Sequence, residues 1–595
     1  MNSTISTERA ESLAFGSRGE SGGRQAKTHS REEFRIDFSS LLIIGVAAVL
    51  SSLPMLLYGP MPGSWDSFEH INFARHFSDQ FWRGEWYPRW LIDMNHGLGS
   101  PTLFVYPPLP SFVYTLLTPV AKVLHLDAFR AGEFLALFGS GVTAFLWMST
   151  MASRTASRLS AVLYMLMPYH LAINYYHRSA LSECWALVWM PLILYFTTRL
   201  IKQNGASLIG LAVAYALLIL SHLVTVLLFS LLPLALTAVL SSRSDRLRSL
   251  LRFSIGMLLG IGLSSFYLIS AFSHAKYFPV SRLPLWHNLD HHFLLRVSTM
   301  LHGGSMIHKG SLAAASMIAV CVICSVIVLV IGSSESKNRV YFWLIPCGIS
   351  VWLMTGASAL LWRDIPAFHA AVQYPGRLTI ILCVASLPIL AIFLCEIKLQ
   401  PPLAKSLMLI VLGVAVTPWL IAYRGVWVSY HLQLQTPLKN ASVNEYDGWF
   451  LSWPVRALDD SSALRASKEP RVRFLTGIGN ADSILWKPRH LEIETESQNG
   501  GEIGVNQFYY PEWKASLATG AQAIDVEPAM PEGLIKLRVP PGHQLVRLEI
   551  PTGLAERFGQ WISAFSLLFC IALITRIGLP FGSDVRPQAA VADAS

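Results

Sequence analysis

Charged side chains are scarce in this chain of 595 residues, at 14%, while hydrophobic residues make up 53%. A soluble domain carries about 25% charged residues, so the composition excludes a soluble globular protein. Apolar runs of roughly 20 residues recur along most of the length, which predicts a polytopic membrane protein. The net charge of +9 does not indicate nucleic-acid binding, because much of the Lys and Arg falls in short loops between these runs.

Cysteine is also rare, and its placement argues against a disulfide framework. All seven cysteines lie in or at the ends of apolar segments, and none lies in the large polar region near the C-terminus. Cys321 and Cys324 form a C-x-x-C pair inside an apolar run. The sequence favours small packing residues on one helix face there over a redox or zinc site. Heptads and internal repeats are lacking as well.

The apolar runs predict about twelve transmembrane helices. The predicted spans are 39–58, 131–151, 159–175, 181–200, 207–222, 223–240, 253–273, 312–332, 340–361, 377–395, 406–425 and 559–579. With this count the Lys- and Arg-bearing loops face the cytoplasm, as do the polar, disordered tail 1–38 and the tail 580–595. The count requires segment 107–124 to stay outside the membrane as a re-entrant or interfacial helix.

The predicted fold is therefore mainly α, with a small β domain outside the membrane. The multi-span domain covers 39–425 and includes an outer loop at 59–130, and the last helix is 559–579. Between them, residues 426–558 carry alternating strand patterns, such as those that begin at His490, Leu534 and Leu545. Pro and Gly punctuate these patterns, which favours a small β-sandwich on the outer side.

The outer loop 59–130 carries a bare carboxylate, Asp66, among aromatic residues. The pattern Asp66-x-x-Glu69 opens a predicted helix that runs to about Trp82, so one interpretation is an N-cap with a capping box. The other interpretation is a catalytic carboxylate, acting as a general base or a metal ligand. Both can hold together, since an N-cap fixes the position of a carboxylate.

His70 lies one helical turn beyond Asp66 and can share its face. His70, Phe73, Phe77 and Phe81 form a stripe at helical spacing. We expect this stripe to lie against lipid or the outer ends of the spans rather than to bind a ligand.

Three arginines are candidates to contact an anionic group. Arg89 is flanked by aromatic residues in Tyr87-Pro-Arg-Trp90, where it can stack on a ring, bind a phosphate or anchor the chain at the interface. Arg178 either pairs with Glu183 or faces the loop 59–130 with it. Arg377 follows Gln373 on the same predicted face and is placed for a lipid phosphate or for headgroups.

Histidines supply weaker signals. His222 ends a predicted span, and a single histidine there is more often structural. The loop 274–311 holds six of the eighteen histidines, yet their spacing fits no template for a tightly bound zinc ion.

Several segments together carry a resemblance. They are Asp66–His70, Trp82–Trp90, Gly97–Pro101, Tyr106–Leu109, Tyr176–Glu183, Ser221–His222, Gln373–Arg377, Phe508–Lys514, Leu537–His543 and Gly559–Ile562. This set resembles bacterial integral membrane proteins labelled "6-pyruvoyl-tetrahydropterin synthase-related", over most of the chain from about residue 39. That family looks like the glycosyltransferase C (GT-C) superfamily in architecture. The pterin label does not indicate an activity, because the sequence shows no zinc-binding histidine triad.

The resemblance implies an enzyme of the bacterial cytoplasmic membrane that takes a sugar from a polyprenyl-phosphate donor. The acceptor, a glycan, lipid or protein, would attack at the outer face with Asp66 as general base, which inverts the anomeric centre. Arg178, Arg377 or Arg89 would stabilise the departing phosphate. The candidate substrate-binding residues are His70, Arg89, Tyr106, His170, Tyr176, Arg178, Glu183, His222, Gln373 and Arg377.

A metal site is placed in doubt by one departure from the superfamily pattern. Many members carry paired acids in the outer loop, whereas here Trp65 and Ser67 flank Asp66 and the nearest second acid is Glu69. No metal ligand is assigned, and a divalent metal ion stays open as a cofactor.

Two other classes of function stay open. A transporter or flippase should show ionisable residues or broken helices near mid-membrane, and the predicted spans are nearly free of such charge. A non-catalytic scaffold in cell-envelope assembly stays open because the motif holds a single acid.

Overall fold

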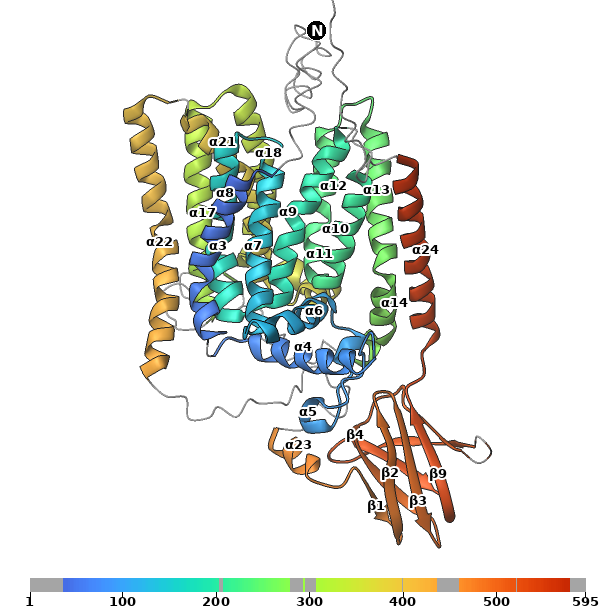
Figure 1. Cartoon of the computed structure of the whole chain (residues 1–595). Helices are drawn as coiled ribbons and strands as arrows, with labels where there is room; N and C mark the ends of the chain where they lie inside the picture. The colour runs from blue at the N-terminus through green and yellow to red at the C-terminus, as the bar shows by residue number, and fades with distance from the viewer. Residues whose placement is uncertain are drawn as a thin grey trace, which may run out of the picture.

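The computed structural model describes residues 36–577, apart from 62, 203–206, 279–292, 295–305, 399, 436–459, 519 and 521. The predictions for most of the two terminal tails, and for part of the outer region 426–558, therefore lie outside the described residues. Within them, a bundle of roughly parallel and antiparallel helices occupies one part of the molecule and a β-rich region hangs from one end of it (Figure 1).

Long helices form the bundle. They are α3 (Phe38–Tyr58), α7 (Ala128–Met148), α9 (Leu181–Ile201), α13 (Arg246–Leu263), α17 (Met306–Ile331), α18 (Ser334–Leu353), α21 (Thr379–Lys398), α22 (Pro402–Gln435) and α24 (Leu554–Ile577). Shorter ones complete it: α8 (Arg154–Leu166), α10 (Ser207–Ser221), α11 (Leu223–Phe229), α12 (Leu231–Leu240), α14 (Ser265–His274), α19 (Ala359–Asp364) and α20 (Pro366–Val372). Nearly all of the apolar side chains of helix α21 are buried within the bundle.

Seven helices among the described residues are long and apolar enough to cross a membrane, or up to nine if two bent pairs each count as one span. The bends are 70° between α13 and α14 and 81° after α18. This confirms a multi-pass membrane protein, while the count of twelve spans stays a prediction. Helix α22 covers the predicted span 406–425 and continues to Gln435, well into the region expected to be the outer domain.

The expectation of one α-helix over 159–175 is wrong. Helix α8 ends at Leu166, and residues Tyr169–Arg178 form a separate π-helix, η2. Met167 between them has ψ of 134°, because a residue that precedes a proline is pushed out of the helical region. The break at Pro168 therefore allows the chain to enter η2 in a new direction.

The outer loop folds into a layer across one end of the bundle. It contains α4 (Ser67–Trp82), α5 (Met94–Gly97), a short 3₁₀ turn η1 (Thr102–Phe104) and α6 (Leu109–Val123). Helices α4 and α6 lie across the ends of the bundle helices at its β-rich end (Figure 1). The interfacial position predicted for 107–124 stays a prediction.

The aromatic stripe on α4 does not face lipid. Phe73 and Phe77 are buried, and the Phe77 ring meets the ring of Phe112 on α6 edge to face at 4.8 Å. Because α6 folds back over α4, the stripe becomes the core of the loop layer, which fixes α4 and hence the residues at its ends.

The β-rich region predicted near the C-terminus is present as two antiparallel sheets. One has the order β1 (Val472–Thr476), β4 (Gly501–Phe508), β8 (Leu534–Val539) and β7 (Val526–Ala529). The other has the order β2 (Gly479–Lys487), β3 (His490–Ser497), β9 (Gly542–Glu549), β5 (Lys514–Leu517) and β6 (Ala523–Ile524). A short helix, α23 (Asp460–Ser467), precedes them. Buried side chains of both sheets belong to one hydrophobic cluster; the sandwich arrangement stays a prediction.

The loop layer is bonded directly to the β region. The side-chain oxygen of Gln507 accepts a hydrogen bond from Trp90 Nε1 at 2.8 Å, and its nitrogen donates to the carbonyl oxygen of Gly97 at 2.6 Å. The Phe508 N–H donates to the Leu98 carbonyl at 2.6 Å. Gly99 has φ of +84°, and a Cβ there would lie 2.5 Å from Gln507 Oε1, so this junction requires glycine.

A buried ion pair network joins three parts of the chain. Glu556, in the first turn of α24, contacts Arg89 Nε at 3.2 Å and Arg489 of the β2–β3 turn at 3.1 Å. Arg89 is 2% exposed, donates to the Phe266 carbonyl at 2.8 Å and lies over the Tyr87 ring. Of the three alternatives for Arg89, the structure shows stacking on a ring, and the burial of Arg89 against Glu556 argues against a role in phosphate binding.

Replacing Glu556 by Gln should destabilise the fold, because it leaves two guanidiniums facing each other without their carboxylate. We expect a loss of about 3–5 kcal/mol in the free energy of unfolding, measured by denaturant titration of the purified chain in detergent. The control is Asp93→Asn, which breaks an ion pair with Arg83 that is largely exposed and should cost under about 1 kcal/mol. Equal effects of the two substitutions would contradict a buried network that joins these elements.

Candidate functional site

Asp66 lies at the N-cap position of α4 but does not act as a cap. Its side chain makes no hydrogen bond to the backbone N–H groups of the helix, so the capping-box interpretation is wrong. Its own N–H donates to the Arg178 carbonyl at 2.9 Å, and the Trp65 N–H donates to the His177 carbonyl at 3.2 Å. The backbone of the outer loop is thereby bonded to the end of η2, and the carboxylate turns toward Arg178.

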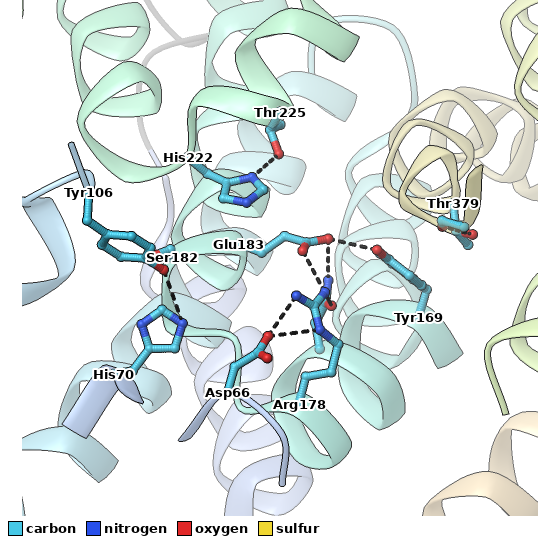
Figure 2. Close-up of polar contacts among 12 residues, drawn as sticks. Asp66, His70, Tyr106, Tyr169, Arg178, Ser182, Glu183, His222, Thr225 and Thr379 are labelled. Atoms are coloured by element: carbon cyan, nitrogen blue, oxygen red, sulfur yellow. Dashed lines mark hydrogen bonds and ion pairs between the residues drawn. The ribbon is translucent and has the colours of Figure 1, made fainter. Parts of the chain in front are cut away.

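Arg178 bridges two carboxylates that come from different elements (Figure 2). Its Nη2 and Nε contact Asp66 Oδ2 at 2.7 and 3.0 Å, and its Nη1 contacts Glu183 Oε2 at 2.7 Å. The two alternatives for Arg178, pairing with Glu183 or facing the outer loop, are thus realised together.

The local chain path brings Arg178 and Glu183 together. Ser179 adopts the left-handed conformation, with φ of 49° and ψ of 48°, which ends η2 shortly before α9 begins at Leu181. Glu183 therefore lies in the first turn of α9, on the side that faces the arginine. A residue other than glycine in this conformation is uncommon and often marks a functional position.

Glu183 is buried and fully satisfied. Besides Arg178, it accepts hydrogen bonds at Oε1 from the Tyr169 hydroxyl at 2.7 Å and from Asn174 Nδ2 at 3.1 Å. Asn174 also accepts from Arg178 Nη1 at 2.9 Å. All three nitrogens of the Arg178 guanidinium are consequently bound to protein oxygens, which argues against the expectation that Arg178 binds a phosphate.

Asp66 keeps one oxygen available. Both contacts with Arg178 use Oδ2, and 33% of the side chain is exposed. Oδ1 is therefore the oxygen that an incoming group can reach, while Oδ2 holds the carboxylate in a fixed direction. A base needs this combination of fixed orientation and access.

A second chain of polar contacts links α4 to α9 beside Asp66. The Tyr106 hydroxyl lies 3.4 Å from His70 Nε2 and 3.1 Å from the Ser182 hydroxyl (Figure 2). Burial lowers the pKa of His70 to about 4, against the opposing effect of Asp66. His70 is therefore neutral at pH 7 and serves as a hydrogen-bonding group rather than a cation.

His222 and Arg377 border the network on its other sides. His222 Nδ1 lies 2.7 Å from the Thr225 hydroxyl, and its ring faces Glu183 (Figure 2). Arg377 lies in the short turn before α21, with its guanidinium over the Tyr374 ring at 4.9 Å and close enough to Glu183 for an electrostatic interaction. Its Nε is buried and has no hydrogen-bond partner among the described residues.

Four predicted site residues bond outside this network. Arg89 binds Glu556 as described above. The Tyr176 hydroxyl donates to the Ser51 carbonyl at 2.5 Å, and His170 Nδ1 lies 3.1 Å from the Tyr164 carbonyl. Gln373 occupies a turn with φ of 72°, and its N–H donates to His369. Their observed contacts are structural, because each connects or shapes backbone segments.

Residues that the sequence analysis did not single out complete the site. They are Tyr169, Asn174, Ser182 and Thr225. The signal available was the density of polar residues between Pro168 and Glu183, which is unusual for a turn between two apolar segments. Nothing in the spacing indicated which of these side chains would face Glu183.

A divalent metal ion does not fit the described residues around Asp66. No group of three or more His, Cys, Asp or Glu side chains that could hold a metal occurs in the described part of the chain. The Arg178 guanidinium, bound to Asp66 Oδ2, would also repel a cation there. Of the six histidines in the loop 274–311, those at 287, 291, 292 and 302 lie outside the described residues. His274 bonds to the Tyr510 hydroxyl of the β region.

Comparisons with known proteins give only a distant likeness. No family model and no curated protein matches the chain. Among solved structures it is similar to the arabinofuranosyltransferase AftD from Mycobacteria, with 17% identity and a TM-score of 0.41 over 67% of this chain and 27% of that one. A mutant form of the same enzyme gives 16% identity and a TM-score of 0.41, over 65% and 28%. The chain thus spans about a quarter of the length of those enzymes, and the likeness assigns neither a family nor an activity.

His70 should make the stability of the fold depend on pH in a defined window. Because the folded pKa of about 4 lies below the ordinary 6.5, the unfolded chain binds a proton between these values that the folded chain does not. Stability from this source is complete above pH 6.5 and falls with pH, by up to about 1.4 kcal/mol per pH unit. The free energy of unfolding is measured from pH 7 to pH 4 for wild type and His70→Asn. The variant should show a shallower slope against pH, smaller by the uptake of one proton on unfolding. An unchanged slope would contradict a buried neutral His70.

Proposed function

We propose that this chain is an integral membrane glycosyltransferase, resembling the 6-pyruvoyl-tetrahydropterin synthase-related and GT-C enzymes, that uses a polyprenyl-phosphate sugar donor. The observation that carries the proposal is the partly exposed carboxylate of Asp66, oriented by Arg178 at the end of the helix bundle. The proposed site of reaction is the outer face of the bacterial cytoplasmic membrane, where a glycan, lipid or protein acceptor is reached.

The proposed step is a direct displacement. The acceptor hydroxyl oxygen attacks the anomeric carbon, and the bond from that carbon to the donor phosphate oxygen breaks. The hydroxyl proton passes to Asp66 Oδ1, and polyprenyl phosphate leaves with the bonding electron pair. Attack from the face opposite the leaving group inverts the anomeric centre, and this chemistry needs one base and a stabilised leaving group.

Arg178 is shared between two carboxylates. Here the positive charge is divided between Asp66 and the buried Glu183, so the trio carries one net negative charge. Arg178 therefore orients Asp66 without fully neutralising it.

Arg377 is the arginine best placed for the leaving phosphate. Arg178 is occupied by Asp66 and Glu183. Arg89 also has a buried nitrogen without a partner among the described residues, Nη1, but it is paired with Glu556 outside the Asp66 network, whereas Arg377 interacts with Glu183. Arg377 Nε has no hydrogen-bond partner among the described residues, and a buried donor without a partner costs about 1–3 kcal/mol. A phosphate oxygen would recover that cost.

The position of the site suits a lipid-linked donor. Helices α4 and α6 lie at the end of the bundle from which the β region hangs (Figure 1), which we take as the outer side, and Asp66 directly precedes α4. A donor with its tail between bundle helices would present its phosphate and sugar at this level. The segment 66–109 that carries the family resemblance also supplies His70 and Tyr106 to the site.

Transport is the second candidate, and Glu133 favours it. This residue of α7 is fully buried, and among the described residues its carboxylate has the Cys184 thiol beside it but no nitrogen or oxygen hydrogen-bond partner. An ionisable residue inside a membrane helix is a functional candidate by default. A proton- or ion-coupled transporter should lose transport with Glu133→Gln and keep it with Asp66→Asn. For a glycosyltransferase we expect the opposite, with Asp66→Asn as the more damaging substitution.

Asp66→Asn should lower the rate of sugar transfer by at least about 100-fold, because the amide keeps the shape but cannot accept the proton. The assay follows labelled sugar from a panel of polyprenyl-phosphate sugars into acceptor, with the product anomer determined by NMR. Asp79→Asn, at an exposed position of the same helix, is the matched control and should leave the rate unchanged. Full activity of the Asp66 variant would remove Asp66 as the base.

A further inference from the structure

We propose that Lys309, oriented by His177, is a second cationic contact for the phosphate group of the donor. The inference rests on the proposed function, since it deepens the account of the same site. Lys309 belongs to none of the motifs that the sequence analysis singled out.

Lys309 reaches the site from a different helix. It lies in the first turn of α17, and its Nζ is 3.5 Å from His177 Nδ1. Residue 177 directly precedes Arg178, and its carbonyl oxygen accepts the N–H of Trp65 at 3.2 Å. The ammonium group therefore lies within hydrogen-bond distance of His177, whose backbone segment also bonds to the backbone of Trp65 and Asp66.

His177 is suited to orient an ammonium group. Burial lowers the pKa of His177 to about 4, and Lys309 acts in the same direction. The imidazole is therefore neutral at pH 7, and its Nδ1 can accept a hydrogen bond from Lys309. A lysine otherwise samples many rotamers, so this contact limits where its charge lies.

Lys309 also keeps its charge available to a ligand. The lysine is exposed, and the two carboxylates of the site are already bound to Arg178. Helix α17 packs against both η2 and the turn that carries Arg377. The site thus has two cations near η2. Arg377 has a buried Nε without a hydrogen-bond partner among the described residues, and Lys309 is exposed. A phosphate carries several acceptor oxygens and can be bound by an arginine fork and a lysine point charge together.

The test measures binding rather than transfer. The purified full chain in detergent is titrated with a polyprenyl phosphate without sugar, and occupancy is read by native mass spectrometry. Lys309→Gln should weaken binding about five- to tenfold, in the range of one charge-assisted contact, while Lys309→Arg should stay within about twofold of wild type because the charge is kept. Lys276→Gln is the matched control: Lys276 is exposed in the short 3₁₀ turn Ala275–Tyr277 that follows α14, with its Nζ over the Tyr277 ring at 4.8 Å.

Three further arms separate the sources of the phosphate and the causes of failure. The corresponding polyprenol, which lacks phosphate, should bind wild type and Lys309→Gln equally. Inorganic phosphate and phosphatidylglycerol should compete weakly; competition by phosphatidylglycerol equal to that of polyprenyl phosphate would make Lys309 a general headgroup contact and overturn the inference. Equal binding by Lys309→Gln and wild type, or an equal loss with Lys276→Gln, would overturn it as well.

The outcome can be told apart from that of the proposed function. If Lys309→Gln loses the phosphate lipid but Asp66→Asn transfers sugar at the full rate, the binding role of Lys309 stands and the catalytic role of Asp66 fails. If the wild-type chain binds polyprenyl phosphate no better than polyprenol, the proposed donor class fails, and the inference fails with it.

Discussion

One guanidinium bound by two carboxylates organises the end of this helix bundle. Arg178 receives Asp66 from the outer loop and Glu183 from the first turn of α9, in a partly dehydrated position. Each carboxylate left alone there would carry a large desolvation cost, and the arginine would carry its own. The three groups are therefore stable only together, so the outer loop must lie where Asp66 can reach η2.

The rest of the outer layer keeps the loop in that place. The Phe73 and Phe77 side chains attach α4 to α6, and Gln507 bonds the loop beyond α4 to the β region. Glu556 then joins both to the last helix. In this arrangement the described part of the β region holds the loop that follows α4. Because Asp66 precedes the first residue of α4, the position of this helix also fixes the position of Asp66.

The sequence predicted features that depend on local pattern. Apolar runs gave the positions of α3, α7, α9, α17, α21 and α24 to within a few residues, and alternation gave the strands that begin at His490 and Leu534. The end of α8 before Pro168 could have been predicted, because a proline restricts the residue that precedes it. The π-helical form of η2 could not, because it depends on what η2 packs against. Helix α22 was expected to end near residue 425, because the sequence loses its apolar character there, yet packing of Tyr423 and Tyr430 on α3 and its end keeps the helix intact.

The site could be predicted only in part, because its contacts are long-range. Asp66 and Arg178 are separated by 112 residues, and no spacing rule relates them. From the sequence, Arg89 between aromatic residues and Arg377 before a predicted span were both candidates for a phosphate. Each has one buried nitrogen without a hydrogen-bond partner among the described residues. What separates them is location: Arg89 is paired with the distant Glu556, whereas Arg377 lies close enough to Glu183 for an electrostatic interaction.

The central claim is that this network acts on a phosphate-linked sugar carried by a membrane lipid. Mass spectrometry of the lipid that co-purifies with the full chain from its native membrane tests the claim most directly. The account predicts a polyprenyl phosphate, with or without its sugar, enriched over its abundance in the membrane. Recovery of bulk phospholipids alone, in the proportions of the membrane itself, would contradict it.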